Sequence, residues 1–284
     1  MTAADPSTQS AHDEGAAGAR TARRVLIAAL VLLLVSALPV LSDRAALAMD
    51  VLAYPHEYGY GEGVVAQQAL MILRGEGYSD LTQEPYVVFH YPPVFHLAAG
   101  AVAAATGNDI VAGGRLASIL ASIAAAGILG WLVWAHARQT LAPLTGPRVG
   151  PGAGPEAGPG AGLGAGLGAR PGAVIGAAEP EARALPPLMA LAAAALALAQ
   201  VPLANSIAVN RVDTVALAAG MAALALATGM LRRPWLMLPT ALAIAATLYA
   251  KQSYLALPAA AMGGAILLAP RLGWRLTGLT LALG

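Results

Sequence analysis

The sequence predicts an all-α polytopic membrane protein, on the strength of its composition and of its long apolar runs. Hydrophobic residues make up 58% of the 284 residues and charged residues only 11%, which is not the composition of a soluble globular domain. Several apolar runs approach the roughly 20 residues that an α-helix needs to cross a bilayer. The net charge of +1 gives no basic excess for nucleic acid, so we expect no such partner. The absence of cysteine excludes disulfides, zinc–thiolate sites and a cysteine nucleophile.

The first apolar run follows a polar N-terminal stretch. We expect residues 1–23 to be a disordered cytoplasmic tail and residues 24–42 to be the first transmembrane helix. The same residues also suit a secretory signal peptide, because Ala46-Leu47-Ala48 resembles a cleavage site. The long polar tail and the many later apolar runs favour an uncleaved anchor. With either interpretation, the chain from Met49 onward emerges on the outer side.

A polar segment, residues 43–112, follows the first span and is predicted to be a large outer loop. It contains many of the acidic groups and three of the five histidines. We expect two helices within it, at about 62–74 and 94–106. The first is bounded by glycines before it and by Arg74-Gly75 after it. The second is too short to cross a bilayer, so we predict a juxtamembrane or re-entrant helix.

The remaining apolar runs predict further transmembrane helices. The second span is expected at 113–135, and a Gly/Pro-rich cytoplasmic linker, which cannot form a core, at 136–184. Later helices are expected at about 185–204, 212–231, 235–250 and 254–269, and another starts near 276. Because this last run has only begun where the sequence stops, we expect the chain to be truncated at its C-terminus.

Positive charges set the predicted orientation, because cytoplasmic loops carry an excess of Lys and Arg. We assign these residues to the cytoplasmic side: Arg20, Arg23, Arg24, Arg138, Arg148, Arg170, Arg232, Arg233, Arg271 and Arg275. The N-terminus is then cytoplasmic in the plasma (inner) membrane, and the loop 43–112 lies outside. Asn205–Asp213 and Lys251 are expected near the same outer face.

Glu62 is the first candidate for chemistry in the outer loop. A carboxylate at the start of a helix is stabilised by the helix dipole, which is sufficient to explain a lone Glu at this position. The functional alternative is a general base or metal ligand that faces a cavity at the membrane surface. Glu62 by itself does not decide between the two.

The His90-Tyr91-Pro92-Pro93 segment predicts a rigid, extended entry to the helix at 94–106, because each proline disfavours helical geometry in the residue before it. This segment is either a rigid turn or a support that holds His90 or Tyr91 over a site. His90 and His96 do not share a helical face, so we do not expect a two-histidine metal site.

Two polar interruptions occur among the later apolar runs. Arg211 and Asp213 are two residues apart and do not face each other on a helix. A charge at the bilayer centre costs about 2.5–3.5 kcal/mol, so we expect both to line water or a partner, whether in an ordinary outer loop or in a functional site. Lys251 either extends to water at the membrane edge or binds an anionic ligand such as phosphate.

Taken in order, these motifs resemble the GT-C membrane glycosyltransferases, especially the family 39 type that includes protein O-mannosyltransferases and aminoarabinose transferases. The elements that carry the resemblance span roughly 55–270: Gly61-Glu62, ALMILRGEGY, HYPPVF, Gly107, Gly114-Arg115-Leu116, NRVDTVALA and YAKQSYLALP. The chain departs from the family at two positions. Gly61 replaces the first acid of the usual Asp-Glu pair, and His90-Tyr91 replaces the charged residue that often precedes Pro-Pro.

The resemblance implies a GT-C-like bundle that transfers a sugar from a polyprenyl-phosphate-linked donor to a lipid, glycan or protein acceptor on the outer face of the membrane. Glu62 would activate the acceptor hydroxyl. Three cations would stabilise the departing lipid phosphate: Lys251, Arg211 and Arg115. Orienting or cavity-shaping roles would fall to Asp213, His90, Tyr91, Pro92 and Pro93. With Gly61 in place of the first acid, the need for a divalent metal stays open.

A polytopic transporter or lipid flippase is the main alternative, because charges at the membrane edge and Gly/Pro-rich helices also suit moving clefts. Such a protein would be expected to contain paired broken helices and an internal repeat, and no convincing repeat is found. A non-catalytic membrane fragment is the third interpretation. The large polar loop directly after the first span fits the transferase better.

Overall fold

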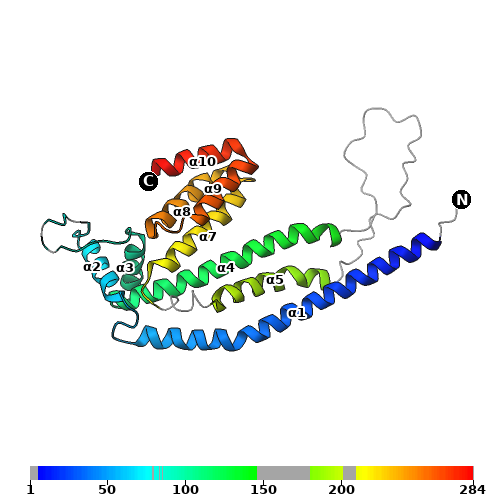
Figure 1. The fold of residues 1–284 in the computed structure, drawn as a ribbon, viewed down its shortest axis with the longest axis horizontal. Helices are drawn as coiled ribbons and strands as arrows, with labels where there is room; N and C mark the ends of the chain where they lie inside the picture. Colours follow the sequence, from blue (N-terminus) through cyan, green and yellow to red (C-terminus); the bar gives the residue numbers. More distant parts are fainter. Residues whose placement is uncertain are drawn as a thin grey trace. The chain divides into compact units, whose positions relative to one another are not determined.

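The computed structural model in Figure 1 describes residues 6–145, apart from 79, 83 and 85, together with 180–200 and 209–283. Within these segments every regular element is a helix, so the predicted all-α class is confirmed there. The elements are α1 (Pro6–Ala53), α2 (Glu62–Leu73), α3 (Val94–Thr106), α4 (Ile110–Thr145), α5 (Pro180–Ala199), α7 (Val212–Met230), η1 (Pro234–Leu236), α8 (Met237–Ala250), α9 (Ala256–Leu268) and α10 (Pro270–Leu283). Three stretches with predictions lie outside the described residues: most of the predicted Gly/Pro-rich linker, 146–179, the end of the helix predicted at 185–204, and the first part of the predicted outer segment, 205–208.

Four of the described helices are long and apolar enough to cross a membrane: Ala17–Ala53, Ile110–Leu141, Pro180–Ala199 and Val212–Met230. Large aliphatic side chains on the first of them, such as Leu32 and Leu38, are exposed in the protein itself. An apolar surface of this extent requires lipid or another protein around it. The helices therefore support a multi-pass membrane protein.

Helix α1 is longer than predicted at both ends. Residues 6–23 and 43–53 are helical, where a disordered tail and the start of the outer loop were expected. The alanine-rich sequence in both stretches has a high helix propensity, and the polar residues among it do not interrupt the helix. The helix ends just before Tyr54-Pro55, where the proline disfavours helical geometry in the preceding residue.

The later helices also differ from prediction in their bounds. Helix α4 continues into the predicted linker, and α5 begins earlier and ends earlier than the expected 185–204. The predicted spans at 235–250 and 254–269 are helical, as η1 with α8 and as α9, but both are shorter than the four membrane-length helices. Helix α10 starts at Pro270 rather than near 276, because proline is well suited to the first position of a helix.

The chain divides into two units. The first comprises residues 1–31 and 133–189, and in its described part Arg24 of α1 pairs with Glu181 of α5 at 3.2 Å between Nη2 and Oε1. The Arg24 side chain is largely exposed, so this pair adds little to the stability.

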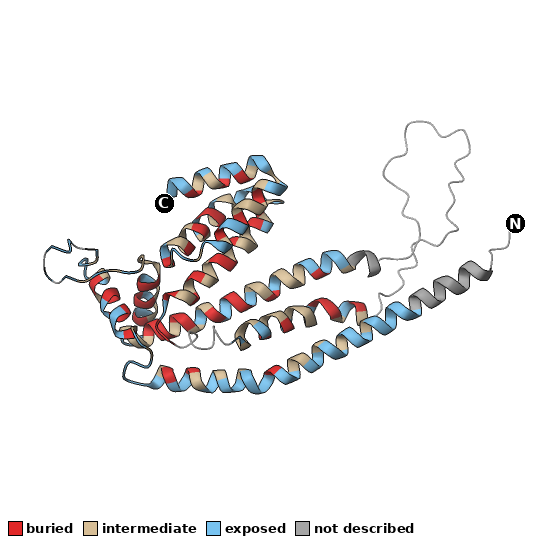
Figure 2. Cartoon of the chain, viewed as in Figure 1, coloured by how far each residue is buried: buried red, intermediate tan, exposed pale blue. Residues whose placement is uncertain are grey.

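The second unit comprises residues 32–132 and 190–284 and contains two buried clusters that matter for the site. One joins α7, α8, α9 and α10 through small and aliphatic side chains: Ala223, Ala227, Met230, Ala241, Ile244, Ala261, Ala265 and Leu276. The other joins α2, α3 and the start of α7 through Val65, Phe95, Ala99 and Val212. Both are part of the buried interior shown in red in Figure 2. The second cluster fixes α2 and α3, which belong to the polar segment 43–112, on the start of α7.

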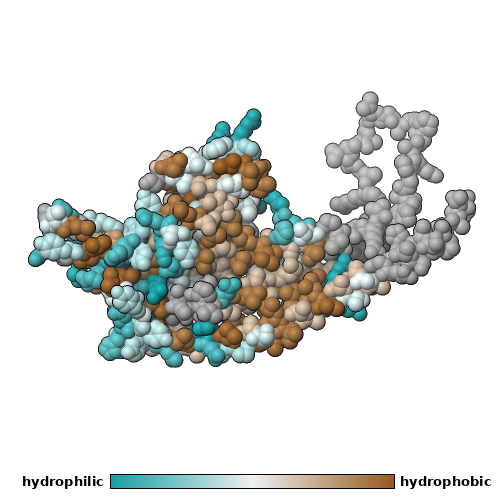
Figure 3. Space-filling model, in the orientation of Figure 1, coloured by the Kyte–Doolittle hydropathy of each residue, from teal (hydrophilic) through white to brown (hydrophobic). Residues whose placement is uncertain are grey.

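Hydrophobic and hydrophilic residues occupy different parts of the visible surface. In Figure 3 hydrophobic residues cover much of the long helices, and hydrophilic residues gather over α2 and the loop that follows it. Helix α2 and the loop that follows it therefore present polar side chains to water on this face.

Gly273 marks the closest approach between α9 and α10. A Cβ atom added there would collide with the backbone of Ala265 and Ile266, whereas one added at Gly278 of the same helix would meet nothing within 4 Å. We expect Gly273→Ala to destabilise the second unit by about 1–3 kcal/mol, because the helices would have to move apart. Thermal unfolding in detergent micelles measures the effect.

Gly278→Ala is the matched control and is expected to be neutral or stabilising, because alanine is a better helix former than glycine. Equal unfolding temperatures for the two variants would show that α10 does not pack on α9 in this way.

Candidate functional site

A buried ion pair lies beneath the polar loop. Arg115 of α4 and Glu62 at the start of α2 are each 1% exposed. The Nη2 atom of Arg115 lies 2.8 Å from Oε2 of Glu62, and Nε donates to Oε1 at 3.0 Å. This paired geometry holds both charges in a fixed orientation.

The remaining N–H groups of Arg115 donate to main-chain carbonyls. Nη1 donates to the carbonyl oxygens of Val51 and Tyr54 at 2.7 and 2.5 Å, and Nη2 to that of His56 at 2.6 Å. All the donors of the guanidinium are thereby used. Arg115 thereby binds the last turn of α1 and the chain that leaves it to α4 by hydrogen bonds.

Both oxygens of the Glu62 carboxylate also accept several hydrogen bonds. In addition to Arg115, it accepts hydrogen bonds from the backbone N–H groups of Tyr58 at 2.8 Å, Gly59 at 3.2 Å and Asn210 at 2.8 Å. Burial alone would raise the pKa of this carboxyl. The hydrogen bonds from Arg115 and from the three backbone groups outweigh burial and lower the pKa from 4.5 to about 2.

This geometry does not favour Glu62 as a general base. The carboxylate is buried, all its accessible lone pairs are engaged, and its low pKa makes it a weak proton acceptor. Arg115 has no free donor with which to bind a phosphate. The two residues predicted for catalysis and phosphate binding are instead placed to hold α1, α2, α4 and the segment before α7 together.

Gly61 explains one departure from the glycosyltransferase pattern. Its backbone is left-handed, with φ of 89°, and it precedes the first residue of α2. Glycine adopts this conformation without strain, whereas an aspartate there would be strained. The position at which the family has its first acid is therefore built as a glycine turn in this chain.

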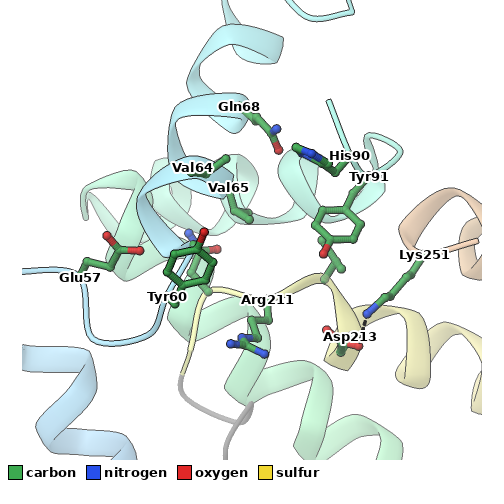
Figure 4. A pocket seen from close by; sticks show the side chains of 13 residues that line it. Glu57, Tyr60, Val64, Val65, Gln68, His90, Tyr91, Arg211, Asp213 and Lys251 are labelled. Carbon is green, nitrogen blue, oxygen red and sulfur yellow. Dashed lines mark hydrogen bonds and ion pairs between the residues drawn. The ribbon is translucent and has the colours of Figure 1, made fainter. Parts of the chain in front are cut away.

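A cavity of about 560 Å³ lies next to the ion pair, between the polar loop and the ends of α7 and α8 (Figure 4). Its lining comes from the loop before α2, from α2, from His90 and Tyr91, from the start of α7, and from Lys251. The residues are Glu57, Tyr60, Gly61, Val64, Val65, Gln68, His90, Tyr91, Asn210, Arg211, Val212, Asp213 and Lys251. Five of the predicted site residues therefore meet in one cavity: His90, Tyr91, Arg211, Asp213 and Lys251.

Lys251 and Asp213 form an ion pair on one wall of the cavity, with 2.6 Å between Nζ and Oδ1. The Tyr254 hydroxyl lies 3.5 Å from the same Asp213 oxygen. The Lys251 ammonium also lies 5.7 Å from the ring centroid of Tyr91, within the range of a cation–π contact. Each member of the ion pair is about a quarter exposed, at 24% for Lys251 and 28% for Asp213. Lys251 therefore lies at the wall of the cavity, and its predicted role in binding an anionic ligand stays a prediction.

Arg211 and Glu57 are the other charged residues in the lining. Arg211 precedes α7 with an extended backbone, φ −133° and ψ 141°, and it is one of the residues that line the cavity (Figure 4). Among the described residues no carboxylate pairs with its guanidinium. Glu57 accepts a long hydrogen bond, 3.4 Å, from the backbone N–H of Gly63 and has no cationic partner in the described segments. Among the residues that the structure describes, the cavity thus holds one cation, Arg211, and one carboxylate, Glu57, that form no ion pair.

Two side-chain contacts fix the wall that carries His90 and Tyr91. Gln68 of α2 donates from Nε2 to the carbonyl of Val88 at 2.8 Å, and the Tyr78 hydroxyl donates to the carbonyl of Tyr91 at 2.8 Å. Pro92 and Pro93 do not line the cavity, and they precede α3 as the predicted rigid entry. The prolines therefore position the wall, while His90 and Tyr91 face the cavity.

Several lining residues were not identified from the sequence, in particular Glu57, Tyr60, Gln68 and Asn210. Glu57 could have been considered, because it lies in the same short loop as Glu62. Asn210 lies in the predicted outer segment, but its backbone contact with Glu62 spans 148 residues and carries no local signal. In the described segments no group of three or more His, Asp or Glu side chains is arranged to hold a metal ion.

Comparisons with known proteins do not add a family assignment. No family model, no curated protein and no solved structure matches the chain.

Removal of one partner of the buried ion pair should strongly destabilise the protein. We expect Arg115→Met to cost about 3–5 kcal/mol, because it leaves the Glu62 charge buried without compensation and frees three carbonyls. Thermal unfolding in detergent micelles measures the loss. Arg74→Met, at an exposed arginine that follows α2, should change little, and an equal loss in both variants would contradict the role of the pair.

The low pKa of Glu62 predicts a specific pH dependence. Its pKa is about 2 in the folded protein and 4.5 as a free group, so its stabilisation is complete above pH 4.5 and is lost as the pH falls toward 2. At about 1.36 kcal/mol per pKa unit this amounts to about 3 kcal/mol. Unfolding measured between pH 6 and pH 2 should show this loss in the native protein and a flatter profile for Glu62→Gln. The same profile in both proteins would contradict the assignment.

Proposed function

We propose that the protein is a membrane glycosyltransferase that takes a sugar from a polyprenyl-phosphate-linked donor and transfers it to an acceptor at the outer face of the plasma membrane. One observation carries the proposal. The cavity combines two cations, two carboxylates and two tyrosines beside helices of membrane length. A lipid-linked sugar phosphate presents the matching groups: an anionic phosphate, a polar sugar ring and a chain that stays in the bilayer.

Arg211 and Lys251 are the residues suited to bind the donor phosphate. Both line the cavity, and their N–H groups can form charge-assisted hydrogen bonds with phosphate oxygens. Lys251 is held by Asp213, so Asp213 keeps the ammonium in place before the donor arrives. As the bond between the anomeric carbon and the phosphate oxygen breaks, the two cations stabilise the negative charge that develops on the leaving phosphate.

Glu57 is the carboxylate best placed to activate the acceptor. It lines the cavity, no cation pairs with it among the described residues, and Glu62 is committed to Arg115. In the transfer step the acceptor hydroxyl oxygen forms a bond to the anomeric carbon, the lipid phosphate leaves with the electrons of the broken bond, and the hydroxyl proton passes to Glu57. Glu62 acts as a positioning residue, since it holds the loop that carries Glu57.

Transfer of radiolabelled sugar tests the proposal. Membranes are prepared from cells that express the protein and are supplied with defined polyprenyl-phosphate donors that carry a radiolabelled sugar. The labelled product is then measured. We expect transfer from at least one donor. Lys251→Gln and Arg211→Gln should each raise the donor KM by tenfold to a hundredfold, because each removes a hydrogen bond to a charged group worth about 1.5–3 kcal/mol. Glu57→Gln should lower kcat by about 10²–10⁴-fold with little change in donor KM.

Glu76→Gln is the control for Glu57→Gln, because Glu76 is an exposed carboxylate of the same polar loop and does not line the cavity. Failure of the expressed protein with every donor would reject the glycosyltransferase. Transfer by Glu57→Gln at the native rate would reject only the role of Glu57.

A further inference from the structure

A basic, tryptophan-containing surface lies at one end of the α7–α10 bundle, away from the candidate cavity. It consists of Arg232, Arg233 and Trp235 between α7 and α8, and of Arg271, Trp274 and Arg275 on α10. We call these six residues the basic surface. All of them are exposed, Trp235 at 70% and Trp274 at 64%.

The packing of the bundle brings the two halves of this surface to the same end. Leu236, next to Trp235, and Leu272, next to Arg271, both pack against the buried cluster that contains Met230. In Figure 1 the α7–α8 and α9–α10 connections lie at the same end of this bundle. The two pairs of arginines therefore lie at the same end of the bundle, although about 40 positions separate them in the sequence.

Helix α10 directs its basic residues outward as a group. Gly273, Leu276 and Thr280 are buried against the bundle. Arg271, Trp274 and Arg275 follow the i, i+3, i+4 spacing that places side chains on one helical face, and all three are exposed. This face of α10 thus presents two guanidinium groups and an indole ring to the outside.

No acidic residue neutralises this positive charge within the bundle. The sequence contains no Asp or Glu after Asp213, and Asp213 pairs with Lys251 at the cavity. Among the described residues no carboxylate forms an ion pair with any arginine of the basic surface. Four positive charges therefore face outward without compensation, which fits a partner that carries several negative charges.

Exposed apolar side chains next to the arginines identify the partner as a lipid surface. Leu267 and Leu268, at the end of α9, are 83% and 74% exposed. Helix α7, which is long enough to cross a membrane, ends at Met230, two residues before Arg232. Leucine in the acyl region, tryptophan at the level of the head groups and arginine at the phosphates is the distribution of residues that an interfacial membrane site requires.

We propose that the basic surface binds the phosphate head groups of anionic phospholipids, in a site separate from the candidate cavity. The arginines bind the phosphates, the tryptophans lie among the head groups, and the two leucines contact the acyl chains. A soluble anion such as inorganic phosphate would use the arginines alone, whereas a phospholipid uses all three kinds of side chain.

Lipid titration of the purified, delipidated protein tests this site. The number of bound phosphatidylglycerol molecules and their apparent Kd are measured by native mass spectrometry, with phosphatidylcholine as the zwitterionic comparison. An anionic lipid gains roughly fivefold in affinity from each nearby arginine. We therefore expect Arg271→Gln/Arg275→Gln and Arg232→Gln/Arg233→Gln each to weaken phosphatidylglycerol binding at least tenfold. Trp274→Ala should also weaken it, and excess inorganic phosphate should not displace the lipid.

Arg44→Gln/Arg74→Gln is the matched control, because it removes the same charge from arginines outside the basic surface. Unchanged binding in this control supports the site. Equal weakening in the control, equal affinity for the two lipids, or full displacement by inorganic phosphate would each overturn the proposal. Lipid binding is measured without any sugar donor, so its outcome is independent of the proposed transferase activity.

Discussion

The buried ion pair between Arg115 and Glu62 is the interaction on which the second unit depends. A charge pair removed from water is tolerated only when every donor and acceptor is satisfied, and here both partners are. The partners of the two side chains come from the end of α1, the loop before α2 and the segment before α7. These hydrogen bonds add to the apolar packing of Ala48 and Val51 of α1 with Ile119 of α4, and of Val65 of α2 with Val212 of α7.

This arrangement separates the charges that maintain the structure from those available to a ligand. Glu62 and Arg115 are fully engaged behind the cavity, while Arg211, Lys251, Asp213 and Glu57 line it. The cavity walls are rigid where the hydrogen bonds of Gln68 and Tyr78 hold the chain. A polar site beside membrane-length helices can thus keep its shape without a large hydrophobic core of its own.

Local sequence signals predicted much of the fold. Glycine, proline and apolar length placed α2 and α3, and proline rules also account for the end of α1, although the alanine-rich continuation beyond residue 42 was not anticipated. The sequence predicted that His90, Tyr91, Arg211, Asp213 and Lys251 lie on the same side of the membrane, and in the structure all five line one cavity. The sequence could not reveal that Glu62 forms a buried ion pair with Arg115. That pairing spans 53 residues and depends on how α2 and α4 pack. Glu57 was missed for the same reason, since only the burial of Glu62 leaves Glu57 as the accessible acid.

The extended backbone at Arg211 has a consequence for the tolerance of this short segment to change. Asn210 is buried and donates to Glu62, while the next residue, Arg211, is exposed and lines the cavity. The length of the segment therefore determines which residue lies beside Glu62 and which is exposed at the cavity. A residue inserted or deleted between Asn210 and α7 would move either the backbone N–H of Asn210 away from Glu62 or the guanidinium of Arg211 away from the cavity. A change in the length of this segment is therefore expected to do more harm than a substitution at one of its positions.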